Sequence, residues 1–131
     1  MDDAASFGPV TPIVPAEDVD RSLAFYVEIL GFEEVFRSGT PTNYAGLRRG
    51  LATIHLFACT EPNIAAWTAF RVSTDRIDSL YEHCQEAGIV HPNGSLGPRP
   101  WGTRDFTVLD PAGVCVTFWE RESGARVTPR T

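Results

Sequence analysis

The sequence predicts an α+β fold of two tandem βαβββ modules, which together form a curled eight-stranded mixed sheet around a cleft. Two observations carry this prediction. One capped helical segment occurs twice at a constant offset of 57 residues, which takes Asp18 to Asp75 and Gly31 to Gly88. Each copy also follows one short extended run and precedes three more.

The two predicted helices are residues 18–31 and 75–88. Each begins with an Asp, whose carboxylate can accept hydrogen bonds from the free N–H groups of the first turn, and each ends at a Gly, which readily adopts the left-handed conformation. Apolar residues recur at spacings of three and four, as expected of helices that cover a sheet. We expect these stripes in the core: Val19, Leu23, Tyr26 and Leu30 in the first helix, and Ile77, Leu80 or Tyr81, Cys84 and Ala87 in the second.

The extended runs are short and are separated by clusters of Pro, Gly, Asn and Asp. The predicted strands are residues 10–14, 32–37, 44–48 and 51–57 in the first module and 68–72, 89–91, 104–109 and 114–119 in the second. A sheet with helices on one face leaves its other face open. Such a concave face is a natural site for a small molecule.

The chain of 131 residues has the length of a single domain. Module one is expected over about residues 9–60 and module two over about 66–120, with a linker at 61–63. The C-terminal residues 121–131 have no apolar periodicity and are expected to form a loose tail.

Composition and charge narrow the class of protein. Hydrophobic residues make up 43% and charged residues 21%, which is ordinary globular usage. The three cysteines have no C-x-x-C spacing and are expected as buried thiols in a reducing compartment. No signal peptide and no apolar segment of membrane-spanning length is visible. We therefore expect a cytoplasmic protein with no membrane partner. The net charge of −6 disfavours nucleic acid as a partner and suits a neutral or cationic ligand.

Two strings resemble a known family. Residues 18–32 resemble the first helix of the vicinal oxygen chelate (glyoxalase/bleomycin resistance/dioxygenase) superfamily, with its D…S-x-x-F-Y…L-G-F pattern. Residues 100–118 resemble the P-W-G…D-P-x-G run of the bleomycin-resistance branch. The resemblance extends over about residues 9–120. It implies a homodimer in which modules of different chains complete each cleft.

The resemblance also allows a test for the metal site of the superfamily's enzymes. Those enzymes hold a divalent ion with His, Gln or Glu on the first, fourth, fifth and eighth strands, and the matching positions here are Thr11, His55, Trp67 and Thr117. Only His55 is a usual metal ligand, whereas stable sites use three or four His, Cys or carboxylate ligands. We therefore expect no metal site of the family type and no cofactor. His83 and His91 are expected on the surface.

Several residues are candidates for ligand binding. The resemblance places Trp101 where resistance proteins stack a tryptophan on the planar tail of the drug, although a lid over the sheet edge is an equal alternative. Gly102 and Arg104 follow in the same loop; Arg104 could pair with Asp105, contact a partner subunit or offer its charge to a ligand. On the fourth predicted strand, His55 and Phe57 face the cleft if Ile54 and Leu56 pack beneath the helix. A hydrogen-bonded structural role for His55 is the alternative. The full predicted ligand set is His55, Trp101, Gly102, Arg104, Phe57, Trp67, Thr11 and Thr117.

These features predict a non-catalytic binding protein of the bleomycin-resistance type, which sequesters a planar, cationic antibiotic-like ligand in a dimer cleft. One alternative is a glyoxalase- or dioxygenase-like enzyme that acts on a small substrate. It would work either without metal, with His55 as general base, or with a metal held in an atypical site. A further alternative is a vestigial cleft in a protein that acts through protein partners.

Overall fold

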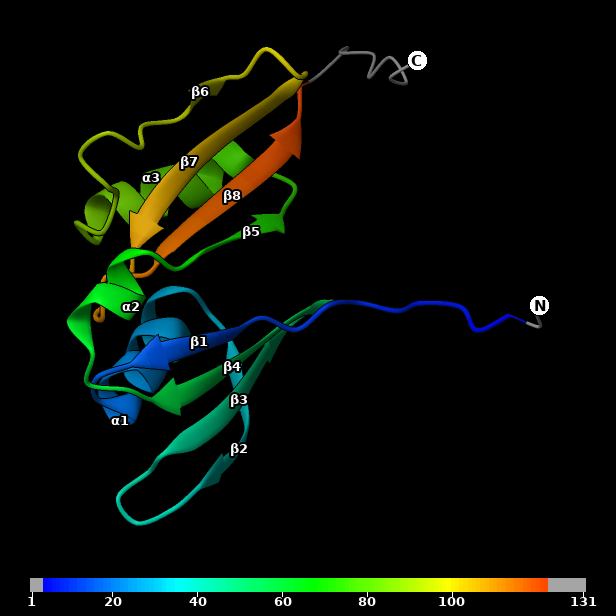
Figure 1. Cartoon of the computed structure of the whole chain (residues 1–131). Helices are drawn as coiled ribbons and strands as arrows, with labels where there is room; N and C mark the ends of the chain where they lie inside the picture. Colours follow the sequence, from blue (N-terminus) through cyan, green and yellow to red (C-terminus); the bar gives the residue numbers. More distant parts are fainter. Residues whose placement is uncertain (1–3, 123–131) are drawn as a thin grey trace.

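The computed structural model describes residues 4–122 and contains two similar modules, each a four-stranded sheet with helices on one face (Figure 1). The first module comprises β1 (Ile13–Ala16), α1 (Val19–Ala24), a π-helical continuation η1 (Phe25–Ile29), β2 (Glu33–Ser38), β3 (Tyr44–Arg49) and β4 (Ala52–Ala58). The second comprises α2 (Pro62–Ala66), β5 (Ala69–Ser73), α3 (Ile77–Glu86), β6 (Gly97–Pro98), β7 (Thr103–Leu109) and β8 (Cys115–Arg121).

The sheet topology confirms the predicted duplication. The strand orders are β1-β4-β3-β2 and β5-β8-β7-β6. The pairs β1–β4 and β5–β8 are parallel, and the other neighbouring strands are antiparallel. The prediction of one eight-stranded sheet is wrong in one respect. The strands β1 and β5 pair only with β4 and β8, so the modules form two separate sheets that are not closed.

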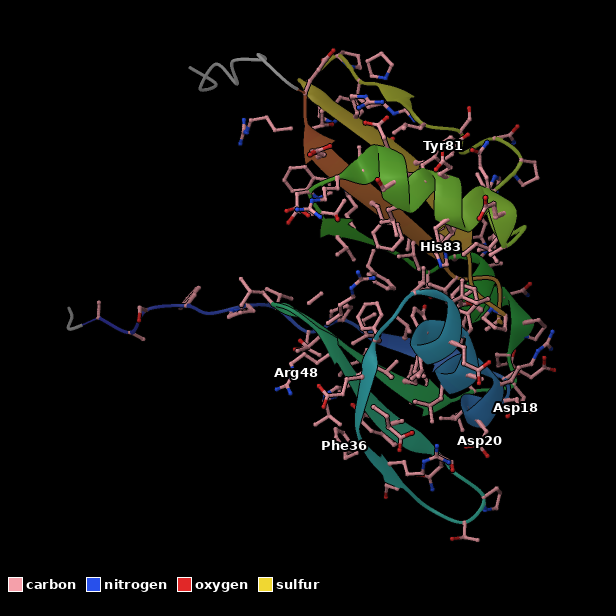
Figure 2. All side chains as sticks on the ribbon, turned by 180° about the vertical axis from the view of Figure 1, so that it is seen from behind. Asp18, Asp20, Phe36, Arg48, Tyr81 and His83 are labelled. Carbon is pink, nitrogen blue, oxygen red and sulfur yellow. The ribbon has the colours of Figure 1, made fainter. Side chains whose placement is uncertain are left out.

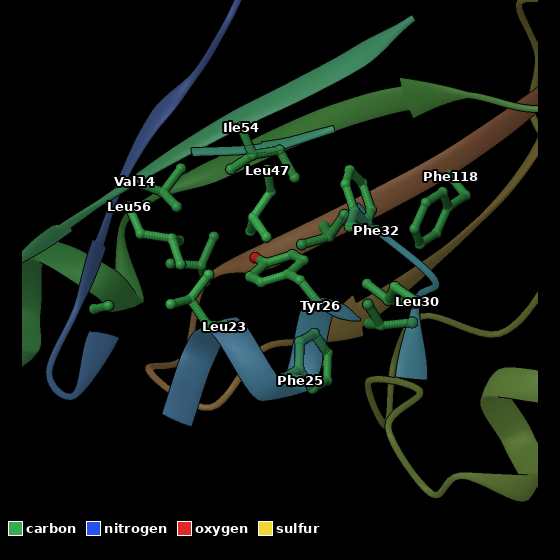
Figure 3. Close-up of a cluster of buried hydrophobic side chains, with 14 of the residues drawn as sticks. Val14, Leu23, Phe25, Tyr26, Leu30, Phe32, Leu47, Ile54, Leu56 and Phe118 are labelled. Atoms are coloured by element: carbon green, nitrogen blue, oxygen red, sulfur yellow. The ribbon is translucent and has the colours of Figure 1, made fainter. Parts of the chain in front are cut away.

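The core lies between each sheet and its helix. The predicted stripe of the first helix is buried, with Val19, Leu23, Tyr26 and Leu30 each 2% exposed or less. Figure 3 shows Leu23, Tyr26 and Leu30 against Val14, Ile54 and Leu56 of the sheet, with Phe118 of β8 facing the same cluster. Residues of both modules belong to this cluster, so it joins the modules to each other as well as each helix to its sheet. Burial of each large apolar side chain contributes about 1.5–3 kcal/mol.

The ends of the helices confirm some caps and correct others. Asp18 caps the first helix by accepting from the Arg21 N–H at 3.1 Å, and Gly31 and Gly88 both adopt left-handed backbone with φ of +73°. Asp75 does not cap the second helix as predicted. The carboxylate of Glu120, on β8, accepts from the N–H groups of Arg76 at 3.2 Å and Ile77 at 3.3 Å. A side chain from a distant strand satisfies these free donors, so no local pattern announces the cap.

His83 is exposed on α3, as predicted, and it also contacts the first module. Its Nε2 lies 2.7 Å from the carbonyl oxygen of Ile29, an acceptor at the end of the first helix that has no partner within the helix. Figure 2 shows His83 on the side of α3 nearest the first module. The imidazole therefore bridges the two modules. His91 is half-buried in its turn, where Nδ1 accepts from the Asn93 N–H at 2.9 Å.

Two further predictions are corrected. The sixth strand lies at Gly97–Pro98, because residues 89–91 make only an isolated bridge from Val90 to Val108. The predicted linker 61–63 is partly helical, because Pro62 and Asn63 form the start of α2; the first turn is a position that the fixed φ of proline favours. The tail prediction falls mostly on residues 123–131, outside the described residues. Within residues 4–122 no helix is long and apolar enough to cross a membrane.

Candidate functional site

Each sheet has an open face on the side opposite its helices. On β4, Ile54 and Leu56 are buried in the core, so Thr53, His55 and Phe57 point to the other side, as predicted. We call this the first sheet face. On β7, Phe106 and Val108 are buried in the core in the same way. We call the opposite side of that sheet, with alternate residues of β5, β7 and β8, the second sheet face.

Aromatic side chains surround His55 on the first sheet face. The Tyr44 hydroxyl lies 2.9 Å from His55 Nδ1, and the ring of Phe36 meets the imidazole edge-on at 5.3 Å between centroids. Gly46 lies beneath the Phe36 ring, where a Cβ would clash with it. Figure 2 shows Phe36 and Arg48 on neighbouring strands of this sheet. The surroundings of His55 on this face are therefore largely aromatic, and a hydrogen bond holds the imidazole.

The second sheet face carries a shallow hollow of about 510 Å³, lined by Arg71, Trp101, Thr103 and Trp119. Trp101 is 59% exposed and lies in the turn that leads into β7. The hydrogen bond from the Gly102 N–H to the Arg99 carbonyl at 3.1 Å closes this turn, and Gly102 adopts a left-handed φ of +90°. The turn thus holds a large indole over an open sheet.

Charged groups border the same hollow. Asp105 is buried and accepts from Arg99 Nε at 2.7 Å and from Arg71 Nη2 at 3.4 Å. Arg104 does not pair with Asp105, because adjacent strand residues point to opposite faces. It makes a bidentate pair with Asp78 of α3 at 2.8 and 3.0 Å, and this hydrogen bonding lowers the pKa of the Asp78 carboxyl. Arg104 is therefore directed away from the second sheet face.

A larger groove of about 1390 Å³ lies between the modules, with most of its walls formed by residues 49–54 and 70–76. Protein groups already engage two of its prominent polar side chains. Arg49 Nη1 donates to the Leu30 carbonyl at 2.7 Å, and His83 meets the Ile29 carbonyl. We interpret this groove as the joint between modules and the smaller hollow as the better candidate for a ligand.

Comparisons with known proteins identify the family. The model of the Glyoxalase/Bleomycin resistance protein/Dioxygenase superfamily matches residues 7–118. This chain belongs to that superfamily. It is 32% identical over 127 residues to a bleomycin resistance protein of Geobacillus stearothermophilus, covering 84% of this chain and 94% of the relative. The corresponding Klebsiella pneumoniae protein is 30% identical over 122 residues, covering 86% and 91%.

A solved structure gives the same relationship for this superfamily member. A bleomycin-binding protein from bleomycin-producing Streptomyces verticillus, complexed with copper(II)-bleomycin, superimposes with a TM-score of 0.76 and 31% identity, covering 88% of this chain and 97% of that one. The resemblance inferred from residues 18–32 and 100–118 is thereby confirmed. The βαβββ duplication and the fold of the bleomycin-binding proteins are the same architecture.

The positions that carry a metal in the superfamily's enzymes can now be examined. The Thr11 and Thr53 hydroxyls bond to each other, and Thr117 Oγ1 lies 2.7 Å from Thr107 Oγ1. Trp67 was misplaced by the prediction: it ends α2, is 88% exposed, and precedes β5. No group of three His, Cys, Asp or Glu among residues 4–122 could hold a metal ion. One imidazole and two mutually bonded hydroxyl pairs do not fit a divalent cation.

The predicted site residues of this superfamily member therefore divide into three groups. Thr11, His55 and Phe57 lie on or beside the first sheet face, and Trp101, Gly102 and Thr117 lie on or beside the second. Arg104 and Trp67 lie on neither. Sequence reasoning did not single out Arg71 or Thr103. The signal for Arg71 was the run A-F-R-V-S, in which an arginine alternates with apolar residues and so faces away from the core.

Proposed function

We propose that this protein binds a planar, bleomycin-like antibiotic and sequesters it without altering it chemically. The observation that carries the proposal is the exposed indole of Trp101 beside Trp119 over an open sheet face. Stacking of an aromatic ring on such a surface adds about 0.5–1.5 kcal/mol beyond area burial. The relatives are bleomycin resistance proteins, and the bleomycin-binding protein with the same fold binds copper(II)-bleomycin.

We also propose a cytoplasmic homodimer in which the first sheet face of one copy opposes the second sheet face of the other. Each chain has two half-sites on separate sheets, so a second copy would complete both. Residues 4–10 extend away from the body (Figure 1), and Phe7 and Val10 in this segment are 97% and 85% exposed. Side chains this apolar are stabilised by a covering surface. Sedimentation at micromolar concentration should give twice the mass of the chain.

Isothermal calorimetry with metal-free and copper(II)-loaded bleomycin tests the binding proposal. We expect saturable heat with one ligand per chain, because a dimer would contain two equivalent sites. Trp101→Ala should lower the affinity at least tenfold, which corresponds to about 1.4 kcal/mol. Trp67→Ala is the matched control, since this exposed tryptophan of α2 lies on neither sheet face. Absence of heat at high micromolar protein would exclude bleomycin as the ligand.

Mass spectrometry of the recovered ligand separates sequestration from catalysis. Sequestration predicts that bleomycin leaves the complex with its mass unchanged after prolonged incubation. The Tyr44–His55 hydrogen bond could orient a general base, so the same incubation should be repeated with His55→Ala. A modified product that appears with the parent protein and disappears with His55→Ala would replace the binding proposal with an enzymatic one.

A further inference from the structure

We propose that the second sheet face binds a planar aromatic group that bears a carboxylate or a similar anionic oxygen group, held by Arg71 and Thr103 beside Trp101 and Trp119. This inference rests on the proposed binding function and specifies the chemistry of the ligand at that site. It differs from the expectation of a neutral or cationic ligand that the net charge of the whole chain suggested.

The first observation is an unsatisfied hydroxyl in the hollow. Thr103 is 7% exposed and lines the hollow, yet its Oγ1 has no hydrogen-bond partner; no other buried side-chain nitrogen or oxygen in residues 4–122 lacks one. A buried donor without a partner is destabilising, and native proteins rarely retain one. An oxygen acceptor on a ligand would satisfy it.

The second observation is the sign of the local charge. Arg71 and Arg99 both contact Asp105, and Arg121 pairs with Thr103 in the β7–β8 ladder, which places it on the same face. Three guanidinium groups therefore accompany one carboxylate. Glu120, the acidic neighbour of Arg121, points to the opposite face and caps α3. A chain with a net charge of −6 thus presents a positive surface at this hollow.

The third observation is that Arg71 retains hydrogen-bonding capacity. Asp105 is held tightly by Arg99 at 2.7 Å, whereas its contact with Arg71 is long, at 3.4 Å. The Arg71 side chain is 47% exposed and lines the hollow directly. A guanidinium presents paired N–H donors that match the two oxygens of a carboxylate. Arg71 and Thr103 together therefore offer donors, and an anion supplies the acceptors.

Three probes with the same ring test the inference: 2-naphthoate, 2-naphthamide and 2-naphthylmethylammonium. The full chain, labelled with ¹⁵N, is titrated with each, and the indole N–H signals are followed by NMR. We expect the dissociation constant of naphthoate to be at least tenfold lower than that of the ammonium compound, with the amide between them. The signals of Trp101 and Trp119 should shift, while that of Trp67 should not, because Trp67 lies on α2.

Variants assign the effect to the proposed donors. Arg71→Gln should weaken naphthoate binding at least fivefold without weakening the ammonium compound, and Thr103→Val should weaken naphthoate at least threefold. Arg37→Gln is the matched control, since this exposed arginine of β2 pairs with Glu34 and with Asp20 of the first helix, which places it on the helix side of its sheet. Arg71→Lys keeps the charge and loses the paired donors, so we expect its affinity for naphthoate to be lower than that of the parent and higher than that of Arg71→Gln. It takes the place of Arg71→Gln in the test if that variant folds poorly.

Several results would overturn the inference. These are equal or tighter binding of the ammonium compound, an equal effect of Arg71→Gln on all three probes, or no shift of either hollow tryptophan with any probe. The bleomycin experiment is independent of these outcomes. Naphthoate binding without bleomycin heat would remove the proposed drug and leave this inference standing. If bleomycin binds but the three probes bind equally well, the proposed drug would stand and this inference would be overturned.

Discussion

The Tyr26 hydroxyl donates a 2.8 Å hydrogen bond to Asp110 Oδ2, a buried contact between residues 84 positions apart. Tyr26 belongs to the first helix, whereas Asp110 opens the turn between β7 and β8 of the second module. The other carboxylate oxygen of Asp110 accepts from the N–H groups of Ala112, Gly113 and Val114 at 2.9–3.0 Å. One side chain therefore organises a turn and also ties the two modules together.

Tyr26→Phe should lower the free energy of unfolding by about 1.5–3 kcal/mol, the range for a hydrogen bond to a charged group. The ring stays in the core, so only the hydroxyl is lost. Urea denaturation measures the change. Tyr81→Phe is the control, because its ring packs on Phe106 within one module, and the change should be below about 0.5 kcal/mol. Equal effects of the two substitutions would show that the link between modules contributes little.

Burial raises the pKa of the Asp110 carboxyl, while its hydrogen bonds from Tyr26 and the turn N–H groups oppose the rise. Between the ordinary pKa of Asp, about 3.9, and the raised folded value, the folded state binds more protons than the unfolded state. Stability from this group therefore falls as pH rises through that window.

Asp110→Asn removes this titration and keeps an acceptor for the turn. The stability of the parent minus that of Asp110→Asn, measured by urea denaturation at a series of pH values, should decrease as pH rises from about 3.9. Exposed carboxyls such as Glu34, whose pKa Arg37 lowers, affect both proteins alike and cancel in the difference. A difference that stays flat or increases with pH would show that Asp110 does not carry the effect.

Thr103→Val should raise the free energy of unfolding by about 1 kcal/mol, because it removes a buried hydroxyl that has no partner. Thr107→Val, two residues along the same strand, is the matched control. Its hydroxyl bonds to Thr117 at 2.7 Å, so its loss should be destabilising. Thermal denaturation of both variants without ligand compares them directly. If Thr103→Val is as destabilising as Thr107→Val, the Thr103 hydroxyl has a partner in solution.

The Cys84 thiol should resist modification in the folded protein. It is buried in α3, and burial raises its pKa to about 11, so little thiolate is present at pH 8. Cys59 and Cys115 are half-buried. Treatment with a disulfide reagent followed by peptide mass spectrometry should label Cys84 only after unfolding. Labelling of Cys84 in the native protein at the rate of Cys59 would contradict its position in the core.

Much of the fold could be predicted because its signals are local. The stripe of the first helix, Ile77 and Cys84 of the second, the Asp18 cap and the two left-handed glycines lie within single segments, and the structure confirms them. Ala87, also predicted in the core, is exposed. The errors arose where distant residues decide. Glu120 replaces Asp75 as the cap of α3, and the surface position of His83, which was predicted correctly, did not indicate its bond to Ile29. No spacing within a helix encodes a partner on another element.

The candidate site shows the same division. The sequence by itself determined the duplicated fold, the family and the position of Trp101 in the loop before β7, because repeats and motifs are contained in contiguous residues. Only the tertiary structure decided that Arg71 and Thr103 share the hollow with Trp101, and that Arg104 and Trp67 do not. Strand register and the path of a turn set these contacts, and the register of Arg71 depends on the pairing of β5 with β8, which joins residues 46 positions apart.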